Sequence, residues 1–280
     1  MKAIPSSVVL PLRSLAAASL LLTAAGSSAA IASYYVGVDN LQNFTSGTYQ
    51  GQANPNHGRL TFLYAHPNYN TPASSHYHSK GVYTLSGPAG SPTVITSSSN
   101  YLPEGANPPL QLTAGSGFYA NKLVSNPYTD AANPGFHFSQ LNIRDTADLS
   151  TSAPGTAEQF LFNSSAGRWN SPIAGADIHL TLVGLSEGLR IGDISALDIG
   201  LNAAGDEFHL GDDIDFTPAF WVDASAAPGT YTATFKLTDE SGLFQESGNF
   251  EFRFTVVPEP SGTLLIAGAA ALGIMRRRRH

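Results

Sequence analysis

Cysteine is absent from this 280-residue chain. Neither a disulfide nor a thiolate metal site can therefore form, so a metal ion would have to be held by histidine, carboxylate or backbone oxygen. A β domain of roughly 200 residues buries enough apolar surface to fold without disulfides. The missing cysteines are thus compatible with an exported protein.

Basic residues are scarce between the two ends of the chain. Residues 33–255 contain eight lysines and arginines against twenty aspartates and glutamates, a net charge near −12, compared with −7 for the whole chain. Such a negative surface repels nucleic acids and anionic membranes, and it favours solubility or the attraction of cations. We therefore expect no nucleic-acid partner.

Helical periodicity is also scarce, and outside the two ends only residues 156–163 show it. Short runs of alternating apolar and polar residues, rich in aromatic and β-branched side chains, predict strands instead. The expected strands cover residues 34–38, 59–64, 81–85, 177–183, 229–237 and 248–257. The sequence predicts an all-β, immunoglobulin-like β-sandwich over residues 33–256, either as one ectodomain or as two sub-sandwiches divided near 127–134.

Residues 1–32 have the features of a secretory signal peptide. Lys2 and Arg13 precede a short apolar run, and Ala30 and Ala32 form the A-x-A pattern that signal peptidase cleaves. Cleavage after Ala32 would make Ser33 the first residue of the mature chain.

Residues 257–280 combine the motif Pro258-Glu259-Pro260, an apolar run and four consecutive arginines. A helix over the thirteen apolar residues would rise about 20 Å, short of the roughly 30 Å hydrocarbon core, with the arginines held on the cytoplasmic side. We therefore expect a transient tether to the inner membrane. The pattern resembles the PEP-CTERM sorting signal of Gram-negative bacteria, whose tail an exosortase recognises and removes. The resemblance implies a secreted protein of the cell surface or periplasm.

Four histidines fall within 22 residues, namely His57, His66, His76 and His78. On a strand, two residues separated by one point to the same face about 6.6 Å apart, so His76 and His78 could share a ligand. Zinc commonly binds three protein ligands and leaves a position open or filled by a carboxylate. If the neighbouring strands pair, His66, His76 and His78 bind one Zn²⁺, and His57 or a carboxylate completes its shell. The alternative is that these histidines are solvated loop residues.

Two weaker patterns concern acidic residues and a serine. Asp212, Asp213 and Asp215 offer oxygen ligands to Ca²⁺ but lack EF-hand spacing, so a solvated loop is the alternative. His209 could add a zinc ligand beside them, whereas His179 lies in an apolar alternation that predicts a structural sheet residue.

Residues 184–188 match the G-x-S-x-G elbow of hydrolases, but that motif needs a following helix. We therefore expect a turn there, and no enzyme.

The stretches 57–66 and 76–83 resemble the Zur-repressed PEP-CTERM proteins, and 167–172 and 189–193 agree with this resemblance. Members are made when zinc is scarce, which implies a role in zinc homeostasis. The family defines no ligand set, so the assignment of the histidines as zinc ligands rests on their spacing alone. The favoured function is an exported, non-enzymatic zinc-binding protein. The alternatives are a structural or adhesive matrix protein, a module that binds polysaccharide and, most weakly, an extracellular hydrolase.

Overall fold

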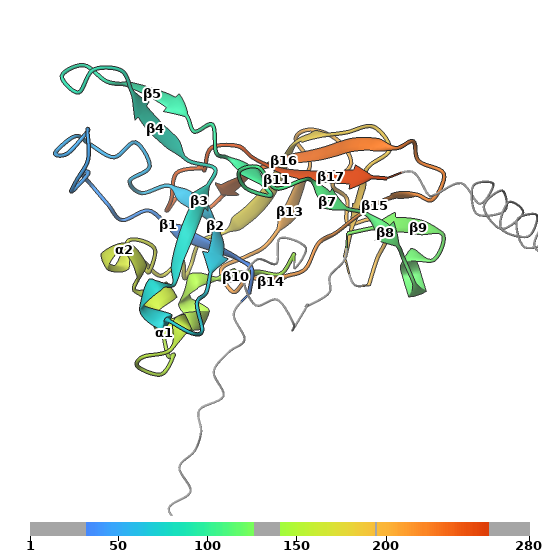
Figure 1. Cartoon of the computed structure of the whole chain (residues 1–280), viewed down its shortest axis with the longest axis horizontal. Helices are drawn as coiled ribbons and strands as arrows, with labels where there is room; N and C mark the ends of the chain where they lie inside the picture. The colour runs from blue at the N-terminus through green and yellow to red at the C-terminus, as the bar shows by residue number, and fades with distance from the viewer. Residues whose placement is uncertain (1–31, 126–140, 194, 258–280) are drawn as a thin grey trace, which may run out of the picture.

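The computed structural model describes residues 32–125, 141–193 and 195–257, and strands form most of its regular structure (Figure 1). This confirms the all-β class. The proposed division near 127–134 lies outside the described residues.

The first sheet has five strands in the order β14-β10-β1-β2-β3. Their bounds are β1 (Tyr34–Val38), β2 (Leu60–His66), β3 (His76–Lys80), β10 (Ile143–Asp145) and β14 (Asp215–Phe216). Strand β1 pairs in parallel with β10 and antiparallel with β2. The first strand of the described chain therefore lies in the middle of the sheet.

The second sheet follows the order β13-β11-β16-β17-β6, with β7 also pairing with β17. Its strands are β6 (Tyr101–Leu102), β7 (Leu110–Gln111), β11 (Ile178–Leu185), β13 (Glu207–His209), β16 (Gly229–Asp239) and β17 (Phe250–Val256). Strands β6 and β7 both pair with β17 in parallel. With the β1·β10 pair, these parallel ladders differ from the antiparallel sheets of an immunoglobulin domain.

The remaining elements are smaller. A four-stranded sheet contains β12 (Arg190–Gly192), β15 (Ala219–Asp223), β9 (Lys122–Val124) and β8 (Thr113–Ala114). The strands β4 (Tyr83–Ser86), which overlaps the strand expected at 81–85, and β5 (Thr93–Thr96) form a projecting hairpin (Figure 1). The helices are η1 (Pro72–Ser74), η2 (Gly117–Tyr119), η3 (Thr146–Leu149), α1 (Ala157–Phe162) and α2 (Ser164–Gly167). Helix α1 confirms the one short helix expected.

The main core lies between the five- and six-stranded sheets. Phe62 of β2 stacks on Phe250 of β17 with ring centroids 4.3 Å apart, and Tyr34 of β1 meets Phe252 edge-on at 5.5 Å. The opposite face of the five-stranded sheet is also covered, because Tyr35 and its neighbours pack against residues of α1 and η3. Burial on both faces explains why β1 and β2 are buried along nearly their whole length.

A buried ion pair fixes the chain just after β1. The side chain of Asp39 is fully buried and accepts hydrogen bonds from the guanidinium of Arg168, from Asn54 Nδ2 at 2.9 Å and from the backbone N–H of Leu41 at 3.0 Å. Arg168 also lies over the ring of Trp169, 4.5 Å from its centroid. The carboxylate is therefore fully paired, as a buried charge must be.

Candidate metal centre

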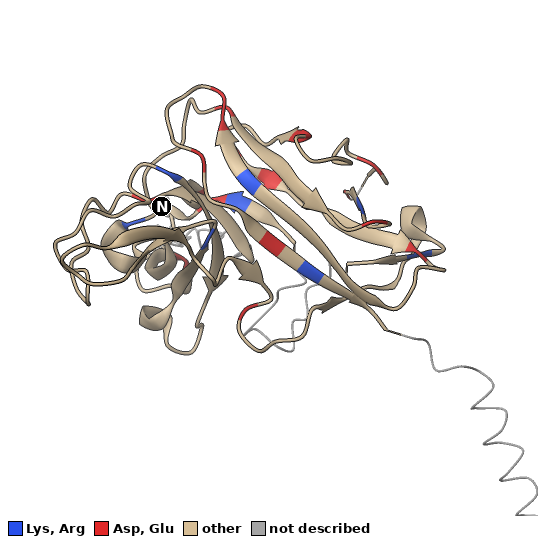
Figure 2. Ribbon diagram, turned by 90° about the horizontal axis from the view of Figure 1, so that it is seen from above, with Lys and Arg blue, Asp and Glu red and all other residues tan. Residues whose placement is uncertain are grey.

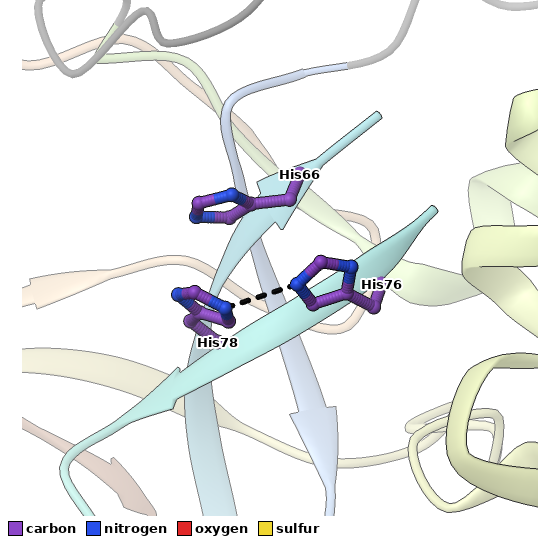
Figure 3. Close-up of side chains that lie close together, drawn as sticks. All are labelled: His66, His76 and His78. Atoms are coloured by element: carbon purple, nitrogen blue, oxygen red, sulfur yellow. Dashed lines mark hydrogen bonds between the residues drawn. The ribbon is translucent and has the colours of Figure 1, made fainter. Parts of the chain in front are cut away.

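The register between β2 and β3 brings three histidines to one end of the five-stranded sheet. His66 lies directly opposite His76, and His78 lies opposite Tyr64. Because side chains alternate along a strand, all three rings project from one face, as Figure 3 shows. One ligand nitrogen from each ring lies within 4.8 Å of the others.

The hydrogen bonds of His76 and His78 determine which of their nitrogens are available. Nδ1 of His76 lies 2.8 Å from the carbonyl oxygen of Ser74, and Nδ1 of His78 lies 2.6 Å from a carboxylate oxygen of Glu104. Both acceptors require an N–H, so in the neutral rings each Nε2 carries a lone pair. These two Nε2 atoms are only 3.0 Å apart. A proton or a metal ion between them removes the repulsion.

Glu104 is the residue of this site that the histidine spacing did not identify. It follows β6 of the other sheet, and one of its oxygens also lies 3.3 Å from Nε2 of His66, while the other lies 2.7 Å from Nζ of buried Lys80. Burial alone would raise the pKa of Glu104, but hydrogen bonds from His66, Lys80 and His78 lower it to about 2. The carboxylate is therefore ionised at neutral pH. A carboxylate that accepts the far N–H of a ligating histidine holds its ring in place and increases its basicity.

The protonation state of His78 also suits a ligand. Burial lowers the pKa of His78, and the nearby His66 and His76 lower it further, although the hydrogen bond to Glu104 acts in the opposite direction. The ring is accordingly neutral at pH 7. Metal binding requires this form, because a protonated imidazole nitrogen has no free lone pair.

His57 lies away from this cluster. It occupies a turn before β2, its backbone N–H bonding the carbonyl of Asn54, and its side chain is exposed. Strand β2 separates it from His66, and seven residues of strand span roughly 20 Å. The structure thus brings together His66, His76 and His78 and places a carboxylate, rather than His57, beside them.

The acidic residues considered for calcium have separate partners. Asp212 accepts the backbone N–H of Gly175 at 2.6 Å, and Asp215 pairs with Arg144 at 3.1 Å. Within the described ranges, the possible metal-holding groups do not include Asp212, Asp213 or Asp215. The structure therefore gives the calcium hypothesis no geometric support.

The serine of the G-x-S-x-G match ends a strand in a turn. The hydroxyl of Ser186 accepts the backbone N–H of Thr232 at 2.8 Å, and the chain continues into β12 rather than into a helix. This hydroxyl hydrogen-bonds the backbone of the neighbouring strand β16. Its surroundings differ from the strand–turn–helix arrangement of a nucleophile elbow.

Comparison with known proteins identifies the C-terminal tail. The PEP-CTERM protein-sorting motif matches residues 256–279, which include Pro258, Glu259 and Pro260. These three residues and Ala30 lie outside the described part of the chain, whereas Ala32 is described and buried. No helix among the described residues is long and apolar enough to span a membrane. No curated protein and no solved structure matches the chain. The sorting motif marks the chain as an exported protein that an exosortase sorts through a transiently membrane-associated tail.

Proposed function

We propose that this exported chain binds one zinc ion through His66, His76 and His78 and serves zinc homeostasis at the cell surface or in the periplasm without catalysing a reaction. The observation that carries the proposal is the pair of Nε2 atoms of His76 and His78, 3.0 Å apart with both Nδ1 atoms facing acceptors. Two ligands of a tetrahedral zinc ion with bonds of about 2.0 Å lie about 3.3 Å apart. The 3.0 Å separation of the two Nε2 atoms is close to that spacing.

The charges around the site favour a cation held mainly by neutral rings. Lys80 pairs with one oxygen of Glu104, so the negative charge of the carboxylate is balanced before an ion arrives. Its other oxygen faces His66 and His78 and orients them. The few lysine and arginine positions are scattered among aspartate and glutamate positions along the ribbon (Figure 2), and the net negative charge raises the local concentration of cations.

The test is calorimetric titration of the purified chain with zinc chloride at pH 7.5 and pH 5.5. We expect binding at pH 7.5 and affinity weakened more than tenfold at pH 5.5, since an imidazole with the reference pKa of about 6.5 is mostly protonated there. Binding is complete above the pKa values of the ligands and is lost as the pH falls through them. Because the pKa of His78 is lowered, this ligand is lost below pH 6.5. If excess zinc at pH 7.5 produces no heat of binding and no thermal stabilisation, the proposal is excluded.

The homeostatic role rests on the resemblance to proteins made when zinc is scarce. We expect the exported chain to be several-fold more abundant in zinc-starved cells than in zinc-replete cells, measured by quantitative mass spectrometry of the surface and periplasmic fractions. Iron starvation serves as the control. Equal amounts in all three cultures would separate the protein from zinc homeostasis and favour a matrix role.

One observation supports the polysaccharide alternative. Phe118 is 64% exposed and, with Tyr119 and Asp193, lines a cavity of about 460 Å³ beside the four-stranded sheet. An exposed aromatic ring next to hydrogen-bonding groups is a surface on which a sugar ring could stack. This cavity is separate from the three histidines.

A further inference from the structure

A second cluster of histidine and carboxylate lies on the six-stranded sheet. His179 of β11 is directly opposite His209 of β13, and Asp177 immediately precedes β11. Along β11 the neighbours of His179, Ile178 and Leu180, belong to the core, so the histidine projects from the outer face. The ring centroids of His179 and His209 are 5.1 Å apart.

The atoms of this cluster have the spacing of metal ligands. Oδ1 of Asp177 lies 3.0 Å from Nε2 of His209 and 3.2 Å from Nε2 of His179. Ligands of tetrahedral zinc are about 3.3 Å apart, given metal–ligand bonds of about 2.0 Å. An ion that replaced the shared protons would therefore need only small movements of the three side chains. Oε2 of Glu240 lies 3.8 Å from Nε2 of His179 and could supply a fourth ligand.

The other ring nitrogen of His179 also suits a histidine that binds a metal ion. Its Nδ1 is buried and has no hydrogen-bond partner among the described residues. Oε2 of Glu207 lies 4.0 Å away, and the other oxygen of Glu207 accepts the hydroxyl of Thr181 at 3.0 Å. An ion on Nε2 would place the proton on Nδ1, and Glu207 could then accept it, as carboxylates do behind ligating histidines.

We propose that Asp177, His179 and His209 form a second site for a divalent cation of the zinc class, with Glu240 as the fourth ligand. The site is independent of the first one. Strand β13 lies at one edge of the six-stranded sheet, and β6, which leads to Glu104, lies at the other. This gives His179 a binding role beyond the structural one that its sequence pattern predicted.

The experiment isolates this site by disabling the other one. Zinc chloride is titrated into the full chain carrying His76→Ala and His78→Ala, and we expect one ion to bind per chain. Adding His209→Ala should weaken this binding more than tenfold, and that side chain is exposed enough to be removed without loss of the fold. Adding His57→Ala instead, a histidine outside both clusters, should leave it unchanged.

Absence of zinc binding to the double variant, or binding that survives His209→Ala, would overturn the second site whatever the first site does. If the double variant fails to fold by circular dichroism, the wild type and the single His209→Ala variant are compared. We then expect one ion fewer in the variant, and equal stoichiometry would overturn the proposal.

Discussion

Replacing His76 and His78 together with alanine is expected to weaken zinc binding at the first site by at least about a hundredfold and to remove one bound ion per chain. The change deletes the two Nε2 atoms that lie 3.0 Å apart and leaves His66 as the only imidazole there. The affinity is measured by competition with a chromophoric chelator at neutral pH, and the number of ions by calorimetry.

The matched control is His57→Ala, which removes an exposed histidine from the opposite end of β2. This variant should bind zinc as the wild type does. Both side chains in the double variant are at least partly exposed, so its circular dichroism spectrum should still be that of a sheet protein. Unchanged affinity in the double variant would show that these histidines hold no metal.

Replacing Arg168 with alanine is expected to lower the free energy of unfolding by about 3 kcal/mol. The guanidinium is the only cationic partner that the described structure gives the buried carboxylate of Asp39. Its removal leaves a buried, ionised group with two neutral donors, and it also removes the contact with Trp169. Urea denaturation at neutral pH measures the change.

The control for this prediction is Lys236→Ala, which breaks the partly exposed pair between Lys236 and Glu246 and should cost less than about 1 kcal/mol. Combining Arg168→Ala with Asp39→Asn should restore part of the loss, because a neutral amide is less costly to bury than an unpaired charge. Similar stabilities of Arg168→Ala and Lys236→Ala would contradict the importance of the buried pair.

Much of the fold could be predicted from the sequence, because apolar side chains mark the buried strands. The strand expected at 34–38 matches β1, and those expected at 229–237 and 248–257 overlap β16 and β17. Helix α1 was visible through its short periodicity over residues 156–163, and the structure shows that the hydroxyl of Thr156 caps it by accepting the N–H of Gln159. These features are local, so a single sequence reveals them.

The candidate metal centre depends on the pairing of β2 with β3 and on the packing of the two sheets, and the sequence gives little sign of either. Strand β3 has the polar sequence His-Tyr-His-Ser-Lys, and the sequence placed a strand only at Gly81, after it. Its register with β2 fixes it as a strand. Glu104 reaches His78 across 26 residues because the two sheets pack together. One signal was available, because Glu104 is the only charged residue between Lys80 and Lys122.

Separation along the chain was also a poor guide to separation in space. His57 lies nine residues from His66, yet an extended strand carries the two apart. His179 and His209 are thirty residues apart, yet the antiparallel register of β11 and β13 makes them neighbours. Asp212 and Asp215 lie within four residues but take separate partners. Strand geometry decides each case.

The central place of β1 has a consequence for the order of events during export. β1 begins directly after the expected signal-peptidase site, so among the described strands it is the first to emerge during export. Its parallel neighbour β10 begins 109 residues later, at Ile143. Pairing over such a separation is slow, because a long loop must close before the contact forms. Both β10 and β14 of the sheet that carries the three histidines therefore lie in the second half of the chain, and one side of β1 stays unpaired until β10 has crossed the membrane.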